Sequence, residues 1–127
     1  MNSPSFYVAV AALLYGCCGA VLARDAVTSV TATATPASYA GSCPTTLQFA
    51  GTIKLSRHPA TVEYLWERSN GSRTPVKRIQ VRSATQKVTD DWSIGGEPGT
   101  LKVWEKLTIL SPNAISSATA KASVNCR

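Results

Sequence analysis

The segment Thr61–Arg68, with the sequence TVEYLWER, decides the fold of this chain. Its apolar residues Val62, Tyr64 and Trp66 recur at every second position, which is the spacing of a β-strand with one buried face. Both glutamates of the segment fall in the opposite phase and therefore face solvent. We expect a central strand in which Trp66 anchors the hydrophobic core.

Shorter segments with the same alternation surround this strand. We expect strands at residues 27–35, 46–53, 61–68, 78–82, 88–94, 101–109 and 118–126. Turn signals separate several of them, namely Asn70-Gly71, the glycine-rich run Gly95 to Gly99, and Ser111-Pro112-Asn113. Seven short strands in roughly 100 residues predict an all-β, antiparallel β-sandwich, with a closed barrel as the alternative.

Two acidic residues interrupt the apolar phase of their strands. Asp90 falls among Val88, Trp92 and Ile94, and it predicts a β-bulge or a strand end near Asp90-Asp91. Glu105 falls between apolar residues in the same way. Neither exception is explained by the sequence around it.

The chain divides into a leader and one domain. Residues 1–23 end in an apolar run and a small-residue cleavage pattern, which predicts a secretory signal peptide followed by a single domain at 24–127. An uncleaved anchor is an alternative, and Leu14-Tyr15-Gly16-Cys17 partly matches a lipoprotein box in which Cys17 would carry the lipid. We expect a secreted, periplasmic or cell-surface protein.

Removal of this segment leaves two cysteines, Cys43 and Cys126. A single pair in an exported chain predicts one disulfide that joins the two ends of the domain. The chain has no Cys-x-x-Cys motif and no histidine next to either cysteine, so we expect a structural bridge and not a redox centre.

The positive charge is localised. The formal net charge is +6, and all of the excess lies between Lys54 and Lys87. Five basic residues on successive strands and their turn predict a strip on one sheet face: Arg73, Lys77, Arg78, Arg82 and Lys87. Trp104, which is out of phase with the apolar residues of its strand, could lie beside this strip. Such a face would attract an anionic polysaccharide or another anionic ligand, and the alternative is a solvated face that prevents edge-to-edge pairing.

Catalytic groups are scarce. His58 is the only histidine and precedes a proline in an expected loop, so we expect no enzymatic activity. Asp90 and Asp91 are adjacent and should point to opposite faces of a strand, so they could not act as a pair across a substrate. With Glu97 and loop carbonyls they could hold Ca²⁺, but without a spaced Asp-x-Asp pattern we favour a polar turn entrance. We expect no metal and no cofactor. Asn70-Gly71-Ser72 matches a glycosylation triplet, but Asn-Gly is also a strong turn signal, and we favour the turn.

Several of these motifs together resemble small immunoglobulin-like modules of secreted and surface proteins of bacteria. The motifs are Cys43-Pro44, Phe49-x-Gly51-x-Ile53, Val62-x-Tyr64-x-Trp66-Glu67-Arg68-Ser69-x-Gly71 and Leu110-Ser111-Pro112-Asn113. The cysteines differ from the antibody pattern, in which the bridge joins two strands across the middle of the core. The resemblance implies an immunoglobulin-like sandwich that binds, spaces or displays, and fold alone does not fix function.

The sequence therefore predicts a non-catalytic binding module at the cell exterior that recognises an anionic ligand through the basic strip. The alternative is a secreted inhibitor or effector that acts on a protein partner through a protruding loop, either Arg57-His58-Pro59 or Gly95 to Gly99. No specific nucleic acid is expected, and membrane contact is expected only through an uncleaved anchor or a lipid.

Overall fold

The computed structural model describes residues 26–127, so the expected signal peptide at 1–23 and the lipidation site at Cys17 lie outside the described residues. The described part is built of β-strands. They are β1 (Val27–Thr35), β2 (Ser38–Gly41), β3 (Thr45–Leu55), β4 (Ala60–Arg68), β5 (Lys77–Val81), β6 (Thr85–Ile94), β7 (Gly99–Ser111), β8 (Ile115–Ser116) and β9 (Ala120–Cys126).

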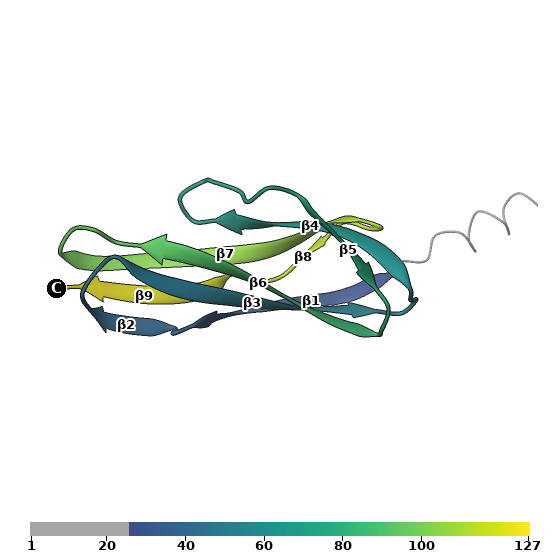
Figure 1. The fold of residues 1–127 in the computed structure, drawn as a ribbon, viewed down its shortest axis with the longest axis horizontal. Helices are drawn as coiled ribbons and strands as arrows, with labels where there is room; N and C mark the ends of the chain where they lie inside the picture. The colour runs from purple at the N-terminus through teal and green to yellow at the C-terminus, as the bar shows by residue number, and fades with distance from the viewer. Residues whose placement is uncertain (1–25) are drawn as a thin grey trace, which may run out of the picture.

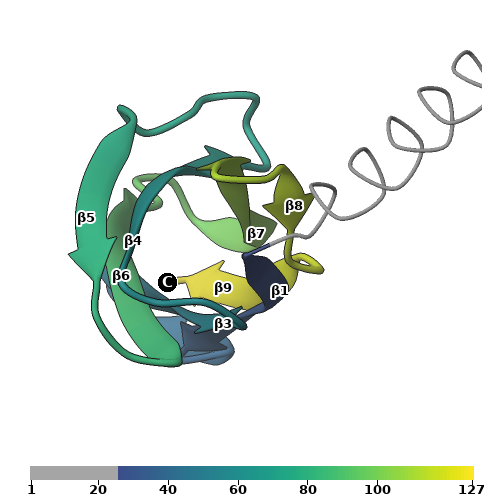
Figure 2. The ribbon, with the colours of Figure 1, turned by 90° about the vertical axis from the view of Figure 1, so that its right-hand side faces the viewer.

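The strands form two sheets that face each other (Figure 1). One sheet has three strands in the order β1-β3-β6. The other follows the order β2-β9-β7-β4-β5, and the two-residue strand β8 pairs with β7. Pairing is antiparallel except between β2 and β9, which run parallel. A view along the strands shows both sheets enclosing a common interior (Figure 2).

The prediction of an all-β, immunoglobulin-like sandwich is confirmed. All seven expected strands are present, and the last one begins at Ala120, two residues later than expected. β2 and β8 are additional short strands that the alternation did not reveal, because four and two residues are too few to show a period. The Asn70-Gly71 turn is also present, and Asn70 Oδ1 accepts hydrogen bonds from the backbone N–H and the hydroxyl of Ser72.

β4 supplies the centre of the core, as predicted. Val62 and Trp66 are fully buried, and Tyr64 is nearly so. Trp66 lies over Gly51 of β3 in the facing sheet: a Cβ atom built on Gly51 would lie 3.1 Å from Cη2 of Trp66 and closer still to Cδ2 of Leu107. The absence of a side chain at Gly51 thus makes room for the indole between the sheets.

Cys43 and Cys126 form the predicted disulfide, with their Cα atoms 5.4 Å apart. It ties the start of β3 to the end of β9 at the end of the sandwich where the chain terminates (Figure 1). Gly95, at φ +96°, packs against both sulfur atoms, and a Cβ there would lie 2.6 Å from Sγ of Cys126. The bridge is therefore covered closely by the connection between β6 and β7.

The predicted bulge at Asp90-Asp91 is wrong. β6 pairs with β3 in one continuous register from Thr45–Ile94 to Lys54–Thr85. Asp90 keeps its place in the inward phase, next to Val88 and Trp92, and Asp91 points outward. The strand stays regular because Asp90 finds a charged partner inside the sandwich, the guanidinium of Arg68.

Replacing Gly51 by alanine should lower the free energy of unfolding by about 1–3 kcal/mol, because the added methyl group overlaps Leu107 and crowds Trp66 in a packed interior. Urea unfolding monitored by tryptophan fluorescence measures the change. Gly96→Ala is the matched control, since a Cβ there has no heavy atom within 4 Å. Equal destabilisation by both substitutions would contradict the proposed role of Gly51.

Replacing both cysteines by alanine should lower the free energy of unfolding by about 4–5 kcal/mol, the loop-closure contribution of a long cross-link. The two residues are separated by 83 positions, so the bridge constrains most of the unfolded domain. Urea unfolding with and without a reductant tests this. Reductant should destabilise the wild type and leave the double variant unchanged, and a double variant as stable as the oxidised wild type would overturn the expectation.

Candidate functional site

The five basic residues of the predicted strip occupy three different segments. Arg73 lies in the connection between β4 and β5, Lys77 and Arg78 begin β5, Arg82 directly follows β5, and Lys87 lies on β6. β5 and β6 belong to different sheets. The structure therefore groups the first four residues around β5 and places Lys87 on the outer face of the three-stranded sheet.

The phase of β5 decides which of these cations share a face. Ile79 and Val81 turn toward the core, while Arg78 and Gln80 turn outward, as the sequence predicted. Lys77 has the inward phase, but it is exposed because β5 is the edge strand of its sheet.

The first of the outward-facing glutamates of β4, Glu63, pairs with one of these cations. The Arg78 guanidinium lies 3.0 Å from the Glu63 carboxylate, and the Ser111 hydroxyl donates a hydrogen bond to the other oxygen of Glu63. The Ser111 hydrogen bond and then Arg78 lower the pKa of Glu63 below its ordinary value. Glu63 thus serves as a local counterion for the basic edge strand.

The second glutamate, Glu67, accepts a hydrogen bond from the Thr108 hydroxyl and lies near two cations, Lys106 at 3.7 Å and Arg73 at 3.9 Å. The Thr108 hydrogen bond is the main reason that the pKa of Glu67 falls, with smaller contributions from the two cations. Arg73 and Lys106 are therefore partly neutralised, whereas no residue of the described chain forms an ion pair with Lys77, Arg82 or Lys87.

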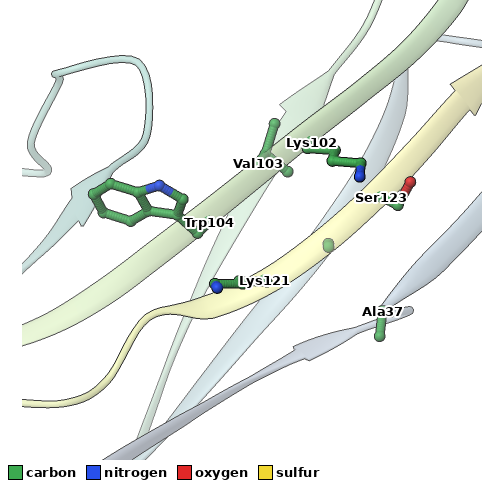
Figure 3. A pocket seen from close by; sticks show the side chains of 7 residues that line it. Ala37, Lys102, Val103, Trp104, Lys121 and Ser123 are labelled. Atoms are coloured by element: carbon green, nitrogen blue, oxygen red, sulfur yellow. The ribbon is translucent and has the colours of Figure 1, made fainter.

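Trp104 lies in a hollow on the outer face of β7 and β9. The cavity has a volume of about 530 Å³. Its lining comes from β7, β9 and the turn before β2, namely Ala37, Lys102, Val103, Trp104, Lys121, Ala122 and Ser123 (Figure 3). We call this hollow the Trp104 groove. It lies away from the cations of β5 but beside the connection between β4 and β5 that carries Arg73, because the Ser69 N–H of this connection donates a hydrogen bond to the Trp104 carbonyl.

Lys102, Lys121 and Ser123 were not predicted as site residues. The strand register makes them neighbours, because Lys102 pairs with Ser123 and Trp104 pairs with Lys121. The sequence did show that Lys102 and Trp104 share the outward phase of one strand. It could not show that Lys121 and Ser123 lie beside them, because that depends on the pairing of β7 with β9.

A largely buried group of charges joins the two sheets. Arg68 of β4 lies 2.9 Å from Asp90 of β6 and 3.4 Å from Glu105 of β7. The Arg68 guanidinium also lies 5.0 Å from the ring centroid of Trp92, within the range of a cation–π contact. These residues follow the inward phase of their strands, so the two acids that interrupted the apolar pattern share one arginine.

Glu105 is the least solvated member of this charge cluster. Its side chain is fully buried, and neither carboxyl oxygen accepts a hydrogen bond from the described residues. Burial, followed by the nearby Asp90, raises the pKa of Glu105 to about 8, and Arg68 offsets only part of this rise. Near neutral pH the cluster therefore contains one arginine, one carboxylate and one largely protonated carboxyl group, which is an electrically balanced arrangement.

The other residues that the sequence analysis considered for binding or catalysis lie in separate connections. His58 lies in the exposed connection between β3 and β4, and Gly95 to Gly99 form the connection between β6 and β7 with the first residue of β7. Within residues 26–127, no group of three or more histidine, cysteine, aspartate or glutamate side chains is placed to hold a metal ion. The same residues include no helix with the length and hydrophobicity required to cross a bilayer.

Comparisons with known proteins support the fold alone. Neither a scan against protein-family models nor a search of curated proteins gave a match. Among solved structures, the chain is similar to the CARDB domain of the PF1109 protein from Pyrococcus furiosus, crystallised in complex with di-metal ions. The TM-score is 0.54 at 13% sequence identity, and the match covers 82% of this chain and 98% of that domain. The similarity supports an immunoglobulin-like module.

Ionisation of Glu105 should make stability depend on pH. The ordinary pKa of this group is 4.5, and in the folded chain it rises to about 8, so between these values the folded state holds a proton that the unfolded state lacks. The free energy of unfolding should therefore fall as pH rises through this window, by about 1 kcal/mol per pH unit at most, and level off above pH 8. Urea unfolding at several pH values measures the slope.

Glu105→Gln should remove most of this slope, because the amide has a similar shape and does not titrate. Glu97→Gln, in the exposed connection between β6 and β7, is the control and should keep the slope of the wild type. If Glu105→Gln and wild type lose stability equally between pH 5 and pH 8, the assignment of the proton to Glu105 is wrong.

Proposed function

We propose that this chain is an exported, non-catalytic binding module that recognises an anionic ligand on the outer surface of the β2-β9-β7-β4-β5 sheet. One observation supports this most strongly. Within the described chain, every glutamate on the strands of this sheet already has a cationic partner, since Glu63 and Glu67 pair with cations on the surface and Glu105 lies beside Arg68 inside.

This use of the acids leaves positive charge uncompensated at the surface. Lys77 and Arg82 at the edge strand β5, and Lys102 and Lys121 on β7 and β9, are exposed and form no ion pair with residues 26–127. A localised excess of one sign attracts ligands of the opposite sign and speeds their association. The cations around β5 would supply this long-range attraction.

The compartment favours a polysaccharide as the ligand. The disulfide between Cys43 and Cys126 is typical of chains that mature in an oxidising environment. Outside the cell, carboxylated and sulfated polysaccharides are a common class of polyanion, and they present charges at repeated intervals that a flat sheet surface can meet. Lys87, on the other sheet, would contribute to the overall field but not to the same contact surface.

Charge reversal at Arg78 and Arg82 tests the proposal. The wild type should be retained on a heparin column and released by salt, because attraction between exposed charges is screened at high ionic strength. R78E/R82E should elute at markedly lower salt. The change is expected to reflect binding and not unfolding, since both side chains are exposed, and circular dichroism verifies that the fold is kept.

K54E/R127E is the matched control, because it changes the net charge equally at residues outside β5: Lys54 lies on β3 of the other sheet, and Arg127 follows β9. It should elute close to the wild type. Equal losses in both variants would mean that only net charge matters. If the wild type is not retained and instead binds a protein partner with weak salt dependence, an inhibitor that acts through a protruding loop would be favoured over the anion-binding module.

A further inference from the structure

The Trp104 groove combines an aromatic ring, two cations and a hydroxyl group in one two-by-two block of residues. On β7, Lys102 and Trp104 are separated by one residue, and on β9 the same holds for Lys121 and Ser123. The register places Lys102 opposite Ser123 and Trp104 opposite Lys121. The two lysines therefore occupy one diagonal of the block, and the tryptophan and serine occupy the other (Figure 3).

Each member of the block has bonding capacity to spare. Lys102 and Lys121 are exposed and have no carboxylate partner in the described chain. The indole N–H of Trp104 makes no hydrogen bond with residues 26–127 and is not among their buried unsatisfied groups, so it keeps contact with solvent. Trp66 differs, because its indole N–H is fully enclosed.

The backbone of Trp104 is held in place by hydrogen bonds to the connection between β4 and β5. Its backbone N–H donates a hydrogen bond to the Ser69 hydroxyl at 3.2 Å, and its carbonyl accepts one from the Ser69 N–H at 3.0 Å. The Ser123 N–H is likewise bound to the Ala37 carbonyl at 2.9 Å, which holds the chain before β2 against β9. The backbone beneath the groove therefore needs little ordering when a ligand binds, and the main entropic cost is that of the two lysine side chains.

We propose that the Trp104 groove is the specific subsite for an acidic saccharide. One sugar ring would stack its apolar face on the indole of Trp104, and Lys102 and Lys121 would bind carboxylate or sulfate groups on that ring and its neighbour. Side chains on a sheet diagonal are about 7–8 Å apart, so the two ammonium groups can meet separate charges of one short segment. The Ser123 hydroxyl can exchange hydrogen bonds with a ring hydroxyl.

The chemistry of the block favours a saccharide over a nucleic acid. Proteins that hold single-stranded nucleic acid stack successive bases on several aromatic side chains along a basic channel. Here Trp104 is the one aromatic side chain in the lining, and the cavity of about 530 Å³ suits one or two sugar rings. The disulfide also indicates an oxidising compartment, where a nucleic-acid ligand is less expected.

This inference rests on the proposed function and adds the ligand class and the contact residues. The probe is a heparin-derived hexasaccharide, titrated into the full mature chain and followed by the indole N–H resonance of Trp104, which is assigned by its absence in Trp104→Phe. The hexasaccharide should shift this resonance in a saturable manner, and the buried indole of Trp66 should not respond. A neutral dextran oligomer of the same length should cause no shift at equal concentration.

Three variants give the quantitative test. Trp104→Ala should weaken hexasaccharide binding by roughly tenfold or more, as loss of an aromatic contact residue at a binding site typically does, and Trp104→Phe should restore part of the affinity. Lys102→Gln/Lys121→Gln should weaken binding and reduce its salt dependence. Thermal unfolding verifies that each variant is folded, and Trp104→Ala keeps both backbone hydrogen bonds to Ser69.

The outcomes separate this inference from the proposed function. Retention of the wild type on heparin with no effect of Trp104→Ala or Lys102→Gln/Lys121→Gln would overturn the groove and leave the anion-binding module standing. Absence of any retention would overturn both. Tighter binding of a single-stranded oligodeoxynucleotide than of the hexasaccharide, with the same dependence on Trp104, would overturn the saccharide assignment in favour of a nucleic-acid ligand.

Discussion

The packing of Trp66 against Gly51 is the contact on which the rest of the structure depends. It fixes the separation of the two sheets at the centre of the core, because a large indole on β4 fits only where β3 has no side chain. The contact is apolar in character, since the indole N–H of Trp66 is buried without a hydrogen-bond partner among the described residues. Leaving such a donor unpaired costs about 1–3 kcal/mol, which the burial of the ring must exceed. The outer faces of the sheets, which carry the basic residues and Trp104, are therefore positioned on a core centred on this contact.

Most of the architecture could be predicted from the alternation of apolar and polar residues. The predicted bulge and the missed charge cluster have one physical cause. The sequence showed Asp90 and Glu105 as two separate exceptions in otherwise regular strands, and although Arg68 continues the inward phase of Val62, Tyr64 and Trp66, nothing in the sequence marked it as their partner. In the structure these residues compensate one another across three strands of both sheets. Each residue breaks the pattern of its own strand but has a charged partner on another strand. A bulge was therefore expected at Asp90, where the strand is regular. Periodicity detects which face a residue takes, but it does not detect what lies across the core.

The same limitation explains what could be predicted of the candidate site. Nearness in sequence suggested that Arg73 to Lys87 form one strip, but the chain changes sheets between β5 and β6, and the glutamates of β4 engage Arg73 and Arg78. Conversely, Lys102 and Lys121 are unrelated in sequence, and only the pairing of β7 with β9 places them on one diagonal. The outward phase of Trp104 was readable from its own strand. Its neighbours were not, because strand order and register are set by long-range packing and not by local pattern.

The arrangement of acids links the interior to the surface. Had Asp90 and Glu105 faced outward, they would have lain among the basic residues of the sheets and cancelled part of their charge. Their placement inside costs desolvation, which Arg68 offsets only in part and which the protonation of Glu105 relieves. The surface cations and the buried charge cluster of Arg68, Asp90 and Glu105 therefore act separately. Lysine and arginine side chains ordinarily keep their charge well above neutral pH, so the proposed binding at the surface should depend on ionic strength, while the stability of the sandwich depends on the proton on Glu105. A protein built in this way can lose stability as the pH rises from about 5 to 8 while its surface lysines and arginines stay charged.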